Sequence, residues 1–324
     1  MAQMTIREAV RRAMIEEMER DETVFLMGEE VGVWGGTYGV SRDMYNMFGA
    51  KRVRDTPISE MVMGGTAVGA AMNGLRPILE YMTVNFAVLG LDAIVNHAAK
   101  VHYMFGGQFN VPLVVRTAAG WGQLSATHSQ TFEAWFSYMP GLKVLFPGTA
   151  ADCYGLLKTA IRDPDPVIFI EHTGLYRYRG EVPDDNNFTI PIGKSDVKRQ
   201  GNDVTVVTYG RMLPLTMEAA DDLSKEGIEC EVVDLRTLRP LDLEPVIASF
   251  KKTYHAAIVT EDFKTAGMSA EIAAQIYERG FDYLDAPLKR IAALEVPLPY
   301  AKNLERLAMP TKEDIKQSIL ELVG

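Results

Sequence analysis

The chain has 324 residues, 47% of them hydrophobic and 23% charged, an ordinary globular composition at a length that suggests two domains. Its formal net charge is -10, and no basic stripe supplies the phosphate contacts that a nucleic-acid partner requires. Cys153 and Cys230 are too few and too far apart for a disulfide framework or a zinc ribbon. No apolar run reaches transmembrane length, and the N-terminus MAQMTIREAV is not a signal peptide, so we expect a soluble, cytoplasmic protein without a membrane partner.

Helical and strand-like segments alternate along the first half of the chain, a pattern typical of a parallel sheet covered by helices. Thr5 and Glu8 form a capping-box pattern for a helix that runs to about Arg20, and Thr149 with Asp152 opens another helix. We expect strands at 23–28, 77–81, 111–117, 143–147 and 167–172, and further helices at about 61–73, 91–104 and 149–162.

A change in composition separates this part from a second α/β unit. The segment 173–200, with Pro183, the run DDNN and Pro191, has the character of a linker crossing the surface. Beyond it we expect a terminal helix starting at Thr311 and strands at 203–210, 229–235, 256–262 and 289–295. The prediction is an α/β fold of two domains, residues 1–180 and 201–324, joined by a linker at 181–200.

Several standard motifs are absent from the sequence. No G-x-G-x-x-G opens a βαβ unit, which makes a nicotinamide-dependent dehydrogenase the weakest option. There is no G-x-x-x-x-G-K-[ST], H-E-x-x-H or G-x-S-x-G, and the five histidines show no metal-ligand spacing. Whatever the chain does, it carries no standard phosphate loop of its own.

Glu60 stands at the mouth of a segment rich in small residues, RVRDTPISEMVMGGTAVGAAMNGLRP at 52–77. Glycine and alanine let another backbone or a flat ligand approach closely, because no large side chain is in the way. A carboxylate entering such a seam is partly desolvated, which raises its pKa and makes it a candidate proton donor or acceptor. A capping or salt-bridged glutamate beside a tightly packed helix is the competing structural interpretation.

Longer motifs add a family resemblance to this interpretation. DTPISE is followed by TAVGAAMNGLRPILEYMTVNF. Seven further motifs stand in the same order as in one family: VFLMGEEV, IVNHAAKVHYMFGG, HSQ, PGLKV, LLKTAIRD, DLRTLRPLD and VPLPYAKNLE. Over nearly its whole length the chain resembles the β subunits of thiamine-diphosphate-dependent 2-oxo acid dehydrogenases, the pyruvate dehydrogenase E1 type. The resemblance implies a pyrimidine-binding parallel-sheet domain followed by a transketolase C-terminal-like α/β domain.

The same resemblance implies roles for individual residues. Glu60 hydrogen-bonds N1′ of the aminopyrimidine of the cofactor, and Ile58, Met82 and Phe86 lie against that ring. His128 of the HSQ motif faces the thiazolium side and helps to acetylate the lipoyl group reductively. On residue type alone, Phe86 is equally a core aromatic and His128 a structural loop histidine.

The stretch TAIRDPDPVIF at 159–169 suggests a cation site, because carboxylates follow the carbonyl end of a helix. Family members hold a potassium ion here, which implies the carbonyls of Leu113, Ala160 and Ile161 with Asp163 and Asp165 as ligands. This chain has aspartate at 165 where relatives often carry asparagine, and a proline between the two aspartates. An ordinary Asp-Pro turn explains the same residues.

The implied function is that of an E1 β subunit, which decarboxylates pyruvate and acetylates the lipoyl group of an E2 acyltransferase. The chain contains no Gly-Asp-Gly segment, so we expect an E1 α subunit to hold Mg²⁺ and the diphosphate in an α2β2 heterotetramer. Relatives of the pyruvate type commonly have a Gly-Phe pair just after the glutamate, where this chain has Val62-Met63. The stretch RTAAGWGQL also departs from the pyruvate type, and EHTGLYRYRGEVP leans toward relatives that act on acetoin or branched 2-oxo acids. Such a substrate, or a non-catalytic assembly role, remains an alternative.

Overall fold

The computed structural model describes residues 1–120, 122 and 124–324, which form two compact units. The first comprises Met1–Ala119 and Trp135–Ile192, and the second comprises Gly120–Ala134 and Gly193–Gly324. Within the described ranges, no helix is both long and apolar enough to cross a membrane.

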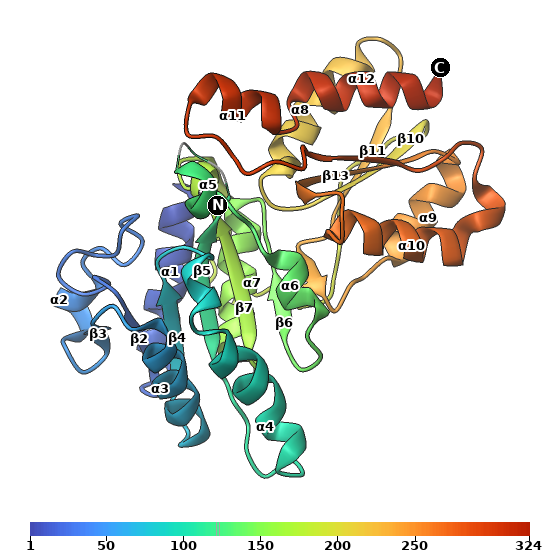
Figure 1. Cartoon of the computed structure of the whole chain (residues 1–324). Helices are drawn as coiled ribbons and strands as arrows, with labels where there is room; N and C mark the ends of the chain where they lie inside the picture. The colour runs from blue at the N-terminus through green and yellow to red at the C-terminus, as the bar shows by residue number, and fades with distance from the viewer. Residues whose placement is uncertain (121, 123) are drawn as a thin grey trace. The chain divides into compact units, whose positions relative to one another are not determined.

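The first unit is built on a parallel sheet whose strands run in the order β6-β7-β5-β4-β2-β3 (Figure 1). Its main register pairs Leu26 with Ile78, Ile78 with Val114, and Val114 with Val167. The strands are β2 (Val24–Gly28), β3 (Val53–Asp55), β4 (Arg76–Tyr81), β5 (Val114–Ala119), β6 (Lys143–Leu145) and β7 (Val167–His172).

Helices cover both faces of this sheet, because side chains alternate between the faces along every strand. Leu26 and Ile78 belong to a buried cluster formed with α1 and α7, whereas Phe25 and Met27 point toward α3. The helical segments are α1 (Ile6–Arg20), α2 (Met44–Phe48), α3 (Glu60–Met72), the 3₁₀ turn Phe86–Val88, the π-helical turn Ala93–Ala98, α4 (Ala99–Met104), α6 (Glu133–Tyr138), α7 (Ala150–Arg162) and the 3₁₀ turn Thr173–Leu175.

The second unit contains a sheet in the order β14-β13-β10-β11-β9, parallel except for the antiparallel edge strand β9. One face packs on α8 and α12 through a cluster that includes Val206, Leu213 and Ile315. Its elements are α5 (Ser125–His128), β9 (Asp196–Arg199), β10 (Val204–Thr208), α8 (Met212–Ser224), β11 (Cys230–Asp234), β12 (Thr237–Arg239), α9 (Glu244–Thr253), β13 (Ala256–Phe263), α10 (Met268–Gly280), the 3₁₀ turn Phe281–Tyr283, β14 (Lys289–Ala293), α11 (Lys302–Ala308) and α12 (Lys312–Val323).

The segment 173–200 differs from the surface linker expected from its composition. It supplies β8 (Arg179–Val182), which pairs antiparallel with β1 (Ala2–Thr5), and it supplies β9 at the edge of the second sheet. Both strands are short and form by pairing with distant segments, so the local pattern of prolines and asparagines carries no signal for them. The helix expected at 91–104 is also interrupted, since its first part is a π-helical turn.

Candidate active site

Glu60 lies where a loop from the edge strand β3 turns into α3. The loop is tied to the sheet by Thr56, whose backbone N–H donates to the Gly28 carbonyl at 2.9 Å. Glu60 is the first residue of α3 and is only 5% exposed, although its side chain carries a carboxyl group. The positive end of the helix dipole favours a carboxylate at this position.

Tyr81, at the end of β4, holds the start of α3 in place. Its hydroxyl donates to the Glu60 carbonyl oxygen at 3.1 Å, and burial, together with the charge of Glu60, raises the pKa of this phenol. The ring lies against two glycines that leave room for it. A Cβ on Gly64 would stand 2.7 Å from the Tyr81 hydroxyl oxygen, and one on Gly90 only 2.1 Å from it. The two glycines therefore let Tyr81 fix the Glu60 backbone.

Glu29 places a second carboxyl group near Glu60. It follows β2 at the carboxyl end of the sheet and is buried, and its Oε1 atom has no hydrogen-bond partner in the described part of the chain. Burial, with smaller contributions from the charges of Glu60 and Glu30, raises the pKa of Glu29. No role for Glu29 was predicted from the sequence. The usable signal was a pair of glutamates directly after a buried strand, where ligands of parallel sheets commonly bind.

Apolar residues lie next to Glu60 in the chain and on the segment that follows β4. Ile58 is 83% exposed, and Met61 on the first turn of α3 is also exposed. Met82 and Phe86 are partly buried and lie on the segment 81–90, which begins at the last residue of β4. Both ends of this segment approach the Glu60 backbone: the Tyr81 hydroxyl donates to its carbonyl oxygen, and a Cβ on Gly90 would lie 3.2 Å from the same oxygen. The four residues predicted to contact the pyrimidine thus belong to two neighbouring segments of one unit. A flat, partly apolar ring that carries a hydrogen-bonding nitrogen fits this combination of a buried carboxylate and apolar neighbours.

The predicted role of His128 is not tested by this geometry. The residue ends the short helix α5 in the second compact unit and is exposed, whereas Glu60 belongs to the first unit. Two residues of the neighbouring stretch RTAAGWGQL, which departs from the pyruvate type, are Trp121 and Gln123. They lie outside the described residues.

At the predicted cation site, the carboxylates of Asp163 and Asp165 share the ammonium group of Lys143, at 2.6 and 3.0 Å. Burial acts to lower the pKa of Lys143, but its hydrogen bonds to these aspartates outweigh burial and raise it.

The carbonyl oxygens at this place also have protein donors. Arg76 Nη1 donates to the carbonyls of Ile161 and Asp163 at 2.9 and 3.1 Å, and the carbonyls of Leu113 and Ala160 accept backbone N–H groups. Among the described residues, no group of three or more His, Cys, Asp or Glu side chains could hold a metal ion. The potassium ligands therefore stay a prediction, in which an added ion has to compete with Lys143 and Arg76.

Comparison with known proteins identifies both units. Residues 2–179 match the family described as "Transketolase, pyrimidine binding domain", and residues 193–315 match "Transketolase, C-terminal domain". A solved structure described as "Split gene transketolase, inactive beta4 tetramer" has a TM-score of 0.77 over 99% of this chain and 98% of its own, at 22% identity. At that identity the match shows the shared fold.

Closer sequence relatives carry one description. "Pyruvate dehydrogenase E1 component subunit beta" of Rhizobium meliloti (strain 1021) is 49% identical over 98% of this chain and 70% of its own length. The corresponding protein of Rickettsia bellii is 48% identical over 98% of both chains. "Pyruvate dehydrogenase E1 component subunit beta-2, mitochondrial" of Oryza sativa is 49% identical over 97% of this chain and 84% of its own. The chain therefore belongs to the family of pyruvate dehydrogenase E1 β subunits, in which a transketolase pyrimidine-binding domain is followed by a transketolase C-terminal domain.

Proposed function

We propose that this chain is the β subunit of a thiamine-diphosphate-dependent pyruvate dehydrogenase E1 and that Glu60 exchanges a proton with N1′ of the cofactor pyrimidine. The observation that carries the proposal is the burial of Glu60 at the start of α3, where Tyr81 holds its backbone carbonyl, on two neighbouring segments that also carry the apolar residues Ile58, Met82 and Phe86. When bound, thiamine diphosphate supplies the carbon nucleophile that attacks the 2-oxo acid. In this proposal the protein contributes the proton acceptor and donor.

Glu29 supports this assignment of Glu60. Glu29 is buried and lies close enough to Glu60 to feel its charge, and burial first, then that charge, raises the pKa of Glu29. A buried carboxyl group of this kind beside Glu60 suits a site in which a proton is exchanged with a weakly basic ring nitrogen.

The test is the activity of Glu60→Gln in complex with a co-expressed E1 α chain. An amide keeps the shape of the side chain but cannot exchange the proton, so pyruvate decarboxylation should fall by about 10²–10⁴-fold at saturating cofactor and Mg²⁺. Glu278→Gln removes an exposed carboxylate from α10 and should keep the wild-type rate. A Glu60→Gln complex that decarboxylates at the wild-type rate would refute the proposal.

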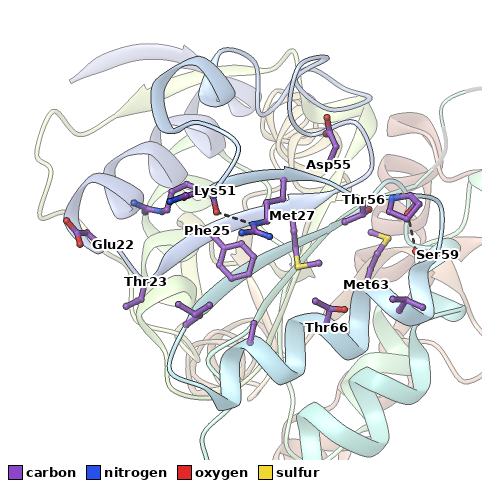
Figure 2. A pocket seen from close by; sticks show the side chains of 16 residues that line it. Glu22, Thr23, Phe25, Met27, Lys51, Asp55, Thr56, Ser59, Met63 and Thr66 are labelled. Carbon is purple, nitrogen blue, oxygen red and sulfur yellow. Dashed lines mark hydrogen bonds between the residues drawn. The ribbon is translucent and has the colours of Figure 1, made fainter.

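We further propose that an E1 α chain packs on the outward face of α3. A cavity of about 430 Å³ lies between this helix and β2, with Phe25 and Met27 on one side and Met63 and Thr66 on the other (Figure 2). On the outward side of the same helix, Met61 and Val62 are 65% and 62% exposed, and a Cβ on Gly65 would meet nothing within 4 Å. Apolar surface of this kind marks an interaction site, and its position next to Glu60 suits a partner that supplies the diphosphate half of the cofactor site.

Two neighbouring glycines of α3 offer a matched test of this contact. A Cβ on Gly65 meets nothing within 4 Å, whereas one on Gly64 would stand 2.7 Å from the Tyr81 hydroxyl and 2.9 Å from Ala93 Cβ. Gly65→Ala should leave the isolated chain at least as stable as wild type, because alanine is favoured over glycine in a helix by about 1 kcal/mol. It should nevertheless weaken association with the α chain, since the new methyl group occupies the proposed contact surface.

Gly64→Ala should instead lower the melting temperature of the isolated chain. Calorimetry on each variant alone and sedimentation of each mixed with the α chain separate the two effects. Association of Gly65→Ala with wild-type affinity would exclude this face of α3 from the interface.

We assign to His128 a role after decarboxylation, in the transfer of the acetyl group to the lipoyl group of an E2 acyltransferase. An exposed imidazole on a short helix can reach a substrate carried by another protein. His128→Ala should therefore reduce acetylation of a free lipoyl domain more than it reduces decarboxylation assayed with an artificial electron acceptor. Equal losses in the two assays would contradict this role.

The substrate is tested with the same complex. We expect a higher kcat/KM for pyruvate than for branched 2-oxo acids or acetoin, and the reverse order would favour the alternative that EHTGLYRYRGEVP suggests. A cytoplasmic location stays a prediction, since the similar proteins include both bacterial and mitochondrial ones.

A further inference from the structure

A second cavity in the first unit, of about 770 Å³, has no part in the function proposed above. The loop between β2 and α2 contributes Trp34, Tyr38 and Arg42, the segment after β7 contributes Arg177, and α1 contributes Arg7. Its lining shares no residue with the segments 58–60 and 81–90 that surround Glu60. The volume falls within the range of pockets that bind small molecules, about 300–1,000 Å³.

The cavity is positively charged, although the chain as a whole has a net charge of -10. Its charged lining residues are Arg7, Arg42, Arg177 and a single carboxylate, Glu30. Within the described part of the chain, neither Arg42 nor Arg177 forms an ion pair, and both side chains are exposed. The site therefore presents guanidinium groups whose charge is not neutralised by a paired carboxylate.

Two of these guanidinium groups converge on one point. Arg42 Nη2 and Arg7 Nη1 lie 3.6 and 3.7 Å from the place where a Cβ on Gly39 would stand. Arg7 is oriented by the Tyr38 carbonyl, to which its Nη1 atom donates at 3.1 Å. Gly39 has a φ of +69°, so the absence of a side chain there both permits the turn and leaves the space between the arginines open.

Arg11 adds positive charge behind the loop and fixes its backbone. Its Nε and Nη2 atoms donate to the carbonyls of Val40 and Gly39, at 2.9 and 2.8 Å. Burial and the positive charges of Arg42 and Arg7 lower the pKa of Arg11, while Asp43 and Glu8 act in the opposite direction. Like charges have thus been gathered at a cost in electrostatic free energy, which a bound anion would offset.

We propose that this cavity binds the phosphate group of a small phosphorylated metabolite. Guanidinium groups bind phosphate through paired, charge-assisted hydrogen bonds, and a dianion matches two convergent arginines, with a third in the same lining, better than a monocarboxylate does. The aromatic side chains of Trp34 and Tyr38 provide apolar surface for the rest of the ligand. The site would allow a phosphorylated compound to act on the subunit without occupying the surface around Glu60.

The test is calorimetric titration of the full-length chain at pH 7.5 and low ionic strength, with inorganic phosphate and inorganic pyrophosphate as probes and malonate as a dicarboxylate for comparison. We expect one saturable phosphate site per chain. Arg42→Gln and Arg177→Gln should each weaken it by about 10- to 100-fold, the effect of losing one charge-assisted hydrogen bond. Arg306→Gln removes an exposed arginine from α11 and should leave the affinity unchanged.

The two lining variants remove exposed side chains without ion pairs, and a circular dichroism melt confirms that each is folded. Absence of saturable phosphate binding would overturn the proposal, and so would equal weakening by Arg306→Gln. Malonate binding as tightly as phosphate would replace the phosphate assignment with a carboxylate one. Because Mg²⁺, the α chain and the Glu60 surface are not involved, this result is independent of the proposed decarboxylation.

Discussion

Gly90→Ala tests whether Tyr81 positions Glu60. A Cβ at residue 90 would stand 2.1 Å from the Tyr81 hydroxyl oxygen, where ordinary contacts begin at 3.4 Å. The hydroxyl oxygen therefore has to move about 1.3 Å away from the new methyl group. That displacement breaks its 3.1 Å hydrogen bond to the Glu60 carbonyl and frees the first turn of α3. A misplacement of about 1 Å at a catalytic group can cost on the order of 100-fold in rate.

The assay is pyruvate decarboxylation by the complex with an E1 α chain, at saturating thiamine diphosphate and Mg²⁺. We expect about a 100-fold loss for Gly90→Ala. Tyr81→Phe removes only the hydrogen bond, whose net worth is about 0.5–1.5 kcal/mol, and should cost less than Gly90→Ala does. The double variant should recover part of the Gly90→Ala loss, but not all, because the ring carbon Cζ still lies 2.7 Å from the new Cβ.

A folded Gly90→Ala complex with the wild-type rate would refute this account of how Glu60 is positioned. So would a double variant no more active than Gly90→Ala, since the clash would then not involve the hydroxyl. Melting temperatures of the isolated chains separate misfolding from misplacement.

Two further predictions concern charged groups away from Glu60. Burial, with the charge of Asp262, raises the pKa of Glu133 to about 8, so the folded chain holds this proton and loses stability as pH rises from about 5 through 8. Relative to Glu133→Gln, the unfolding free energy of wild type should fall as the pH rises through this range in denaturant titrations, whereas Glu278→Gln should match wild type. Equal pH dependence of wild type and Glu133→Gln would contradict this. Lys143→Met leaves the two aspartates that Lys143 bridges without a cation, so K⁺ should raise its melting temperature more than that of wild type, with NaCl as the control. Equal K⁺ stabilisation of both chains would show that Lys143 does not compete for the site.

Local signals predicted much of this fold. Thr5 and Glu8 form the expected capping box, Thr149 accepts the Asp152 N–H at the start of α7, and Thr311 caps the terminal helix. These bonds join residues three positions apart, so the sequence pattern contains the whole interaction. The strands β1, β8 and β9 were missed because each forms by pairing with a segment far away in the chain.

At the candidate site, too, local features could be predicted and contacts between distant segments could not. Glu60 was predicted from its small-residue surroundings and motif, and in the structure it is buried at the start of α3. Its catalytic role stays a prediction. The contacts that hold it were not recognisable, because Tyr81 and Gly90 approach it from another segment. Lys143 was missed for a similar reason. It lies 20 residues before Asp163, and only the parallel pairing of β6 with β7 brings it to the end of α7.

Calorimetric titration of thiamine diphosphate with Mg²⁺ into this chain, alone and after assembly with an E1 α chain, tests directly whether two subunits share the cofactor site. The proposed pyrimidine half-site is at Glu60 and Phe86, whereas the chain lacks a Gly-Asp-Gly segment for the diphosphate and has a net charge of -10 that repels a bare diphosphate. We predict no tight binding by the chain alone and saturable binding, with decarboxylation, by the assembled complex. Tight cofactor binding and pyruvate decarboxylation by the isolated chain would contradict a site shared between two subunits.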